Sequence, residues 1–250
     1  MKYKICIAIP IKSVDLNTNK QILETALEKS PDLIELRFDY IINVQTISLD
    51  FIKDLMNIIT SNTPVIFTFR DPSEGGKIKI DQKERSKILK MFIEAKPEYI
   101  DIEMNTNQNF LYEIINLASQ NGVKIIFSYH NLENTLTYDE SIKLIQIFKI
   151  KLTQELSLTA KVYKNIIYKM VFTAQTFEDN IVPLRLSKEF SNSTQKLISF
   201  CMGPLGIFSR IMCVTVGSFL TYASLEEKTA PGQIHIDEMR EIYNLFLKNL

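Results

Sequence analysis

Eight short apolar runs, spaced along the whole chain, limit most strongly what this 250-residue sequence can fold into. Each run has the length of a buried strand, and stretches with helical periodicity separate most of them. The predicted strands cover residues 5–9, 33–36, 65–69, 99–102, 123–127, 166–172, 197–201 and 218–223. Strands that alternate with helices predict a parallel sheet.

The helical stretches fall at residues 47–59, 81–95, 137–148 and 237–247. Ser48 is placed to cap the first, and the pairs Asp81/Glu84 and Thr137/Glu140 have the spacing of capping boxes. Eight strand-helix units in 250 residues predict one closed (β/α)8 TIM barrel, a single α/β domain over residues 1–250. An open doubly wound sheet is the alternative, which the missing glycine-rich phosphate loop disfavours.

The overall composition excludes several classes of protein. The sequence contains 29 basic and 29 acidic residues, so electrostatics gives no reason to expect nucleic acid or an anionic membrane as a partner. No apolar segment approaches the length of a membrane span, and the run at residues 5–10 is too short for a signal peptide. Cys6, Cys201 and Cys213 lie in apolar runs, as buried reduced thiols do. We therefore expect a soluble, cytoplasmic protein.

Polar side chains gather at the carboxyl ends of the predicted strands, which is where a (β/α)8 barrel places its active site. Because strand residues alternate between two faces, Glu35 shares a face with Arg37, and Ser128 shares one with His130. The candidate residues are Glu35, Arg37, Arg70, Glu74, Asp101, Glu103, His130, Lys169, Arg210, Thr229 and Gln233.

Lys169 is the most unusual of these residues, because apolar and aromatic side chains surround it in the run 166–172. Burial disfavours its charged form, and a neutral lysine amine is a nucleophile toward carbonyl groups. Arg37 and Arg70, expected nearby at the same end of the barrel, would favour the neutral form further by like-charge repulsion. The alternative is a charged residue on an edge strand, or a lysine whose amine reaches solvent.

His130, one of two histidines, ends the fifth strand. A lone histidine is often structural, but next to a buried lysine it is a candidate general acid and base. The arginines at strand ends either form ion pairs with neighbouring glutamates or bind an anionic substrate, since guanidinium groups match carboxylates.

No metal site is expected. Zinc would need a cluster of histidines or cysteines, and two distant histidines do not supply one. Carboxylates could bind magnesium, but arginine and lysine share the same region of the predicted barrel. Asp101 and Glu103 are expected to be structural and to neutralise nearby cations.

Six motifs in this order resemble those of the type I 3-dehydroquinate dehydratases, Schiff-base enzymes of the shikimate pathway, which leads to aromatic amino acids. The resemblance covers nearly the whole chain. The motifs are Asp32 to Asp39, Phe67 to Arg70 with Glu74-Gly75-Gly76, Ser128-Tyr129-His130, Lys169 with Gln175, Met202 to Arg210, and Ala230 to Ile234. It implies a (β/α)8 barrel, no metal or organic cofactor, and a homodimer.

The resemblance also implies the chemistry and the roles. The substrate would be 3-dehydroquinate, and the products 3-dehydroshikimate and water. Lys169 would form an imine with the substrate ketone, His130 would be the general acid and base, and Glu74 would orient His130. The substrate-binding residues would be Glu35, Arg37, Arg70, Arg210, Thr229 and Gln233, with Arg210 on the carboxylate and the last two on a lid loop at about residues 224–236.

Two features depart from the family pattern. The position of Thr229 is often serine in the family, so its extra methyl group is expected to alter the fit. The stretch between His130 and Lys169 is long, and its extra residues, at about 150–165, are expected to extend a helix. The alternatives in function are a barrel aldolase that uses the same lysine and a silent anion-binding barrel.

Overall fold

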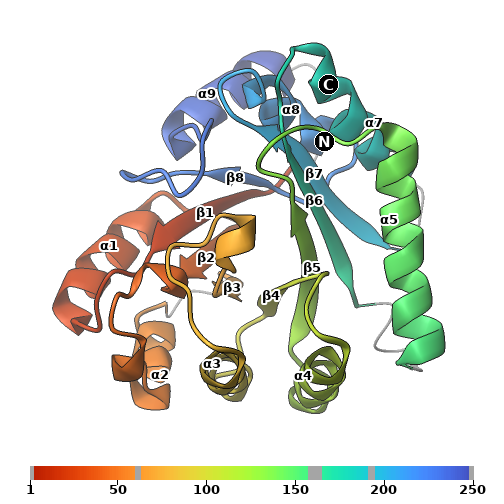
Figure 1. The fold of residues 1–250 in the computed structure, drawn as a ribbon. Helices are drawn as coiled ribbons and strands as arrows, with labels where there is room; N and C mark the ends of the chain where they lie inside the picture. The colour runs from red at the N-terminus through yellow and green to blue at the C-terminus, as the bar shows by residue number, and fades with distance from the viewer. Residues whose placement is uncertain (1–2, 60–62, 157–164, 191–194, 248–250) are drawn as a thin grey trace.

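The computed structural model describes residues 3–59, 63–156, 165–190 and 195–247. Eight parallel strands form one sheet in the order β7-β6-β5-β4-β3-β2-β1-β8, which curves into a nearly closed barrel (Figure 1). The strands are β1 (Ile5–Pro10), β2 (Leu33–Arg37), β3 (Val65–Thr68), β4 (Tyr99–Glu103), β5 (Lys124–His130), β6 (Ile167–Thr173), β7 (Lys196–Met202) and β8 (Thr221–Ala223). The predicted (β/α)8 barrel is confirmed.

The last strand returns the chain to the first. Within β8, Tyr222 stands opposite Cys6 of β1 in the parallel register. At the seam between β7 and β8, the backbone N–H of Phe219 donates to the carbonyl of Leu197 at 2.7 Å. The ladder to β1 begins at Thr221, so β8 is shorter than predicted.

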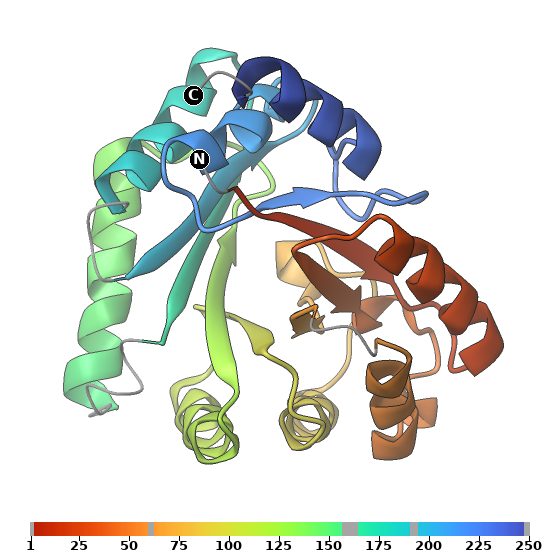
Figure 2. The same cartoon turned by 180° about the vertical axis from the view of Figure 1, so that it is seen from behind.

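The long helices lie outside the strands, as both views show (Figures 1 and 2). They are α1 (Leu16–Glu28), α2 (Leu49–Ile58), α3 (Gln82–Glu94), α4 (Gln108–Asn121), α5 (Tyr138–Ile150), α7 (Ile181–Phe190), α8 (Ile207–Met212) and α9 (Ile236–Leu247). Their apolar faces pack on the outer face of the barrel; in one such contact Phe92 of α3 lies 5.2 Å from Phe67 of β3, ring centroid to ring centroid. None of the described helices has the length and apolar content needed to span a bilayer.

The predicted helix starts are largely confirmed. Ser48 Oγ accepts a hydrogen bond from the Phe51 backbone, and Thr137 forms a complete capping box with Glu140 at the start of α5. At α3 only half of the predicted box is present. The side chain of Asp81 caps the helix. The side chain of Glu84, which would bond back to the Asp81 backbone in a complete box, instead accepts a hydrogen bond from Gln45.

The predicted helical extension near residue 150 is present in part. A π-helical turn, Lys151–Glu155, continues α5, and Leu156 ends it. The remainder of the long segment, residues 157–164, lies outside the described residues. The three cysteines are buried free thiols, as the sequence predicts.

Candidate active site

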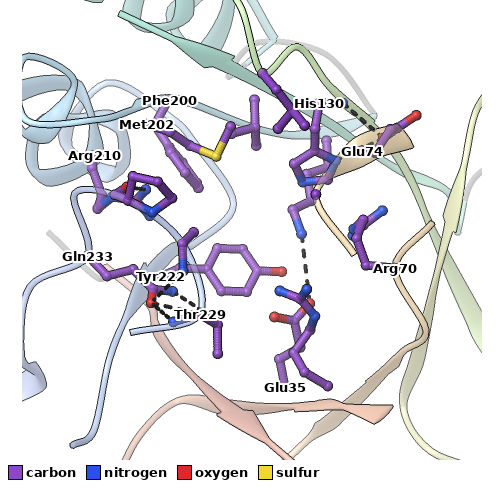
Figure 3. Close-up of a pocket in the computed structure, with 17 residues that line it drawn as sticks. Glu35, Arg70, Glu74, His130, Phe200, Met202, Arg210, Tyr222, Thr229 and Gln233 are labelled. Atoms are coloured by element: carbon purple, nitrogen blue, oxygen red, sulfur yellow. Dashed lines mark hydrogen bonds and ion pairs between the residues drawn. The ribbon is translucent and has the colours of Figure 1, made fainter. Parts of the chain in front are cut away.

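A cavity of about 90 Å³ opens at the carboxyl ends of the strands, and Figure 3 shows the side chains around it. All the residues given catalytic or substrate-binding roles line it, whereas Asp101 and Glu103, which were expected to be structural, do not. The predicted lining residues are Glu35, Arg37, Arg70, Glu74, His130, Lys169, Arg210, Thr229 and Gln233. They meet because parallel strands and the loops that follow them end at the same rim of the barrel.

Lys169 projects from the middle of β6 into this cavity and is 4% exposed. Its Nζ lies 3.0 Å from Asp101 Oδ2 and 3.8 Å from Glu35 Oε1. The side chain is therefore neither on an edge strand nor extended into solvent. The groups in contact with the amine are carboxylates, and Arg70 is linked to it only through Asp101.

Asp101 is the centre of a buried polar network below the cavity. It accepts from Ser128 Oγ at 2.6 Å and pairs with Arg70 at 2.8 Å, in addition to its bond with Lys169. Burial alone would raise its pKa, but the two cations outweigh burial and lower the pKa to about 2. Glu103 pairs with Arg70 at 2.9 Å. Both carboxylates neutralise cations, as expected from the sequence.

His130, at the end of β5, is held by Glu74. Glu74 Oε2 lies 2.9 Å from His130 Nδ1 and accepts a hydrogen bond of the same length from the His130 backbone N–H. Burial, with Arg70 and Lys169 nearby, lowers the pKa of His130 well below 6.5, so the imidazole is neutral at pH 7. Burial raises the pKa of Glu74 to about 8. The pair can therefore hold or release a proton near neutral pH.

The Gly75-Gly76 dipeptide explains how Glu74 reaches His130. Gly75 has a φ of +91°, which reverses the chain directly after Glu74. A Cβ on Gly76 would lie 1.9 Å from the carbonyl oxygen of Arg70, so only glycine fits there. The loop after β3 is thus folded back onto its own strand end, and this holds Glu74 at the cavity.

The three arginines of the site differ in their partners. Arg37 forms two hydrogen bonds with Asp39, at 2.8 and 2.9 Å, and Arg70 pairs with Asp101 and Glu103. Arg210 has no carboxylate partner among the described residues, although only 1% of its surface is exposed.

Arg210 is positioned by neutral groups. Its guanidinium carbon lies 4.4 Å from the centroid of the Phe200 ring, and one terminal nitrogen donates to the carbonyl of Pro231 at 3.2 Å. Its Nε has no hydrogen-bond partner within the described part of the chain. Burial lowers its pKa to about 10, so it stays cationic at pH 7. A buried cation without a counter-charge is costly and predicts an anionic ligand.

The loop after β8 covers one side of the cavity. Gln233 braces it, because its Oε1 accepts from the backbone N–H of Thr229 at 2.6 Å and its Nε2 donates to Thr229 Oγ1 at 3.0 Å. The Pro231 carbonyl joins the loop to Gly203 at 3.3 Å. Gly232 has a φ of +75°, and a Cβ there would lie 2.4 Å from the Gly203 carbonyl oxygen. The loop is therefore fitted closely onto the rim.

Apolar and aromatic lining residues to which the sequence assigned no role include Phe200, Met202 and Tyr222. Strand periodicity could have identified two of these residues, because Phe200 and Met202 are two positions apart on β7 and share its inner face. Within the described residues, no cluster of three or more histidine, cysteine or acidic side chains is arranged to hold a metal ion.

The chain matches a known protein family over nearly its whole length. The family model for type I 3-dehydroquinase matches residues 5–249. The chain belongs to this family. A 3-dehydroquinate dehydratase from Methanococcus maripaludis is 32% identical over 246 residues, which cover 96% of this chain and 99% of that protein. One from Thermococcus onnurineus is 30% identical over 209 residues, covering 84% and 85%.

Solved structures of 3-dehydroquinate dehydratases have the same fold. The enzyme from Clostridium difficile, solved with covalently modified comenic acid, has a TM-score of 0.81 and 27% identity, covering all of this chain and 94% of that one. The enzyme from Geobacillus kaustophilus has a TM-score of 0.84 at 23% identity, covering 100% and 93%.

Proposed function

We propose that the chain is a hydro-lyase that converts 3-dehydroquinate to 3-dehydroshikimate and water through an imine on Lys169. Family membership supports the reaction. The observation that carries the assignment is the buried Arg210, at the rim of a cavity with a buried lysine at its base. Its guanidinium has no counter-charge among the residues that the structure describes. The carboxylate of 3-dehydroquinate supplies that charge.

Formation of the imine makes the proton next to the substrate ketone acidic enough to be removed. The reaction removes a proton next to a ketone and then expels a hydroxyl group, and an unactivated proton there is weakly acidic. When Lys169 attacks the ketone and water leaves, the protonated imine accepts the electron pair released by deprotonation, which gives a neutral enamine. Expulsion of the hydroxyl group and hydrolysis of the imine then regenerate the amine.

His130 carries the protons in this scheme. Its neutral imidazole removes the proton next to the imine and then delivers a proton to the departing hydroxyl group. Glu74 bonds Nδ1, so the reactive nitrogen is Nε2. Arg37, Arg70 and Glu35 line the cavity and contact the substrate hydroxyl groups, while Arg210 fixes which proton faces the imidazole.

The loop at residues 224–236 serves as a lid in this proposal. Thr229 and Gln233 are already buried and bonded to each other, and Arg210 donates to Pro231. Binding of the substrate carboxylate at Arg210 therefore acts on the loop as well as on the ligand. Closure excludes water while the imine is present.

The function is tested by incubating the purified protein with 3-dehydroquinate. Ultraviolet absorbance of the conjugated enone should appear, and chromatography should show 3-dehydroshikimate as the sole organic product. Carbon–carbon cleavage products would favour an aldolase instead, and binding without turnover would favour a silent anion-binding barrel. We place the reaction in the cytoplasm, where three buried free thiols stay reduced.

We also propose that the chain forms a homodimer. Four large apolar side chains are exposed together at the start of α7 and of α8, and two of them, Phe177 and Phe208, have ring centroids 5.2 Å apart. The others are Ile181 and Leu205. An exposed apolar patch of this kind is typical of an interface between subunits.

Light scattering should give twice the chain mass of 28.9 kDa. The substitution Phe208→Glu should shift the protein to the monomer, because it places a charge in the apolar patch. Ile42→Glu is the control, since Ile42 is an exposed apolar residue elsewhere on the surface and its replacement should leave the dimer intact. A monomeric wild-type protein would rule out the dimer.

A further inference from the structure

Tyr222, on β8, is a buried residue of the cavity that the mechanism above does not use. It is 3% exposed and lines the cavity. Its hydroxyl oxygen is buried and has no hydrogen-bond partner among the residues that the structure describes. Because buried hydroxyl groups are nearly always paired, an orphaned one facing a cavity indicates a partner outside the protein.

The direction of the side chain is clear in Figure 3, where the ring of Tyr222 extends from the side of Thr229 toward Glu35 and Arg70. Burial, and then the Glu35 carboxylate, raise the pKa of this tyrosine well above 10. The hydroxyl therefore stays protonated and can donate. The carboxylates nearest the lysine accept hydrogen bonds from other side chains, including Thr68 for Glu35 and Ser128 for Asp101.

The ring of Tyr222 has a separate role. Lys169 Nζ lies 4.5 Å from the ring centroid, a distance at which an aromatic face stabilises a cation. The same nitrogen carries the positive charge of the protonated imine, so the contact persists during the reaction. A phenylalanine would give this contact equally well, and the hydroxyl group is the feature that needs an explanation.

We infer that Tyr222 is a further substrate-contacting residue, whose hydroxyl donates a hydrogen bond to an oxygen of the ligand bound at Lys169. The inference rests on the proposed function and deepens it. The ligand class it fits is a hydroxylated ring with a ketone, because such a molecule brings an oxygen acceptor beside the amine. A ligand without oxygen near the reacting carbon would leave the buried hydroxyl unpaired.

The test is Tyr222→Phe, which removes the donor and keeps the ring. We expect kcat/KM for 3-dehydroquinate to fall about tenfold, equivalent to about 1.4 kcal/mol of transition-state stabilisation. The melting temperature should stay the same or rise, because the hydroxyl has no hydrogen-bond partner in the described part of the protein. Tyr222→Leu, which removes the ring as well, should also slow formation of the imine, measured by borohydride trapping.

Tyr243→Phe is the matched control. The hydroxyl of Tyr243 donates to the carbonyl of Ile211 at 2.8 Å, away from the cavity, so this substitution should lower the melting temperature and leave kcat/KM unchanged. A fall in kcat/KM alone indicates contact with the substrate, whereas a fall in melting temperature alone indicates a structural role. If the wild-type protein is active and Tyr222→Phe has the same kcat/KM, the inference about Tyr222 is wrong and the proposed function stands. A wild-type protein inactive on 3-dehydroquinate would overturn it together with the proposed function.

Discussion

Replacement of Lys169 by methionine is expected to lower kcat by about 10⁴-fold or more, the scale on which loss of a covalent nucleophile acts. Methionine keeps most of the apolar stem and removes the amine. Asp101 retains Arg70 and Ser128 as partners, so its buried carboxylate stays paired and the variant should fold. Borohydride reduction in the presence of 3-dehydroquinate should leave an adduct on Lys169 in the wild type and none in the variant, as measured by peptide mass spectrometry.

Lys124→Met is the control for this experiment. Lys124 begins β5 at the opposite end of the barrel and is paired with Glu98 at the surface. Exposed ion pairs contribute little to stability, so its loss should change neither turnover nor the mapped adduct. An adduct on any lysine other than Lys169 would exclude the imine assignment.

Replacement of His130 by alanine is expected to lower kcat by about 10²- to 10⁴-fold, the usual contribution of a positioned general acid and base. The amine of Lys169 is untouched, so imine formation should continue slowly and the trapped adduct should accumulate. Rapid-quench trapping measures this directly. Near-normal turnover would exclude His130 from the proton transfers, and His235→Ala, the other histidine, should leave turnover unchanged.

The pH profile gives a second measurement on the same pair. Since the pKa of Glu74 is raised to about 8, its carboxyl is protonated below that pH. As pH rises through about 8, the carboxylate forms and accepts a hydrogen bond from Nδ1–H, which leaves Nε2 unprotonated and able to act as a base. Activity should therefore rise with pH through the apparent pKa of the pair. Glu74→Gln should remove this rise, because its amide does not ionise.

The raised pKa of Glu74 also makes the stability of the folded protein depend on pH. The folded-state pKa of Glu74 is above its unfolded value of 4.5, so the protonated carboxyl favours the folded state. That contribution is complete below pH 4.5 and declines as pH rises toward about 8. A gain in activity and a loss of stability thus occur over one pH range, as is common at active sites.

Much of the fold was determined by the sequence itself. Short apolar runs that alternate with capped helices leave few arrangements other than a parallel sheet with helices outside it. Strand periodicity then assigned faces correctly, and for this reason Glu35 with Arg37, and Ser128 with His130, were expected together. The rim of a barrel collects strand ends, so the same pattern located the site.

The partners of the charged groups were decided by tertiary structure. The sequence placed two arginines beside Lys169, whereas Asp101 and Glu35 are in contact with it, because strand register determines which side chains meet across the barrel. Tyr222 reaches the amine from β8, which becomes a neighbour of β1 only when the barrel closes. Arg210 likewise becomes distinctive only in the folded chain, where it is a buried cation without a counter-charge in the described part of the structure.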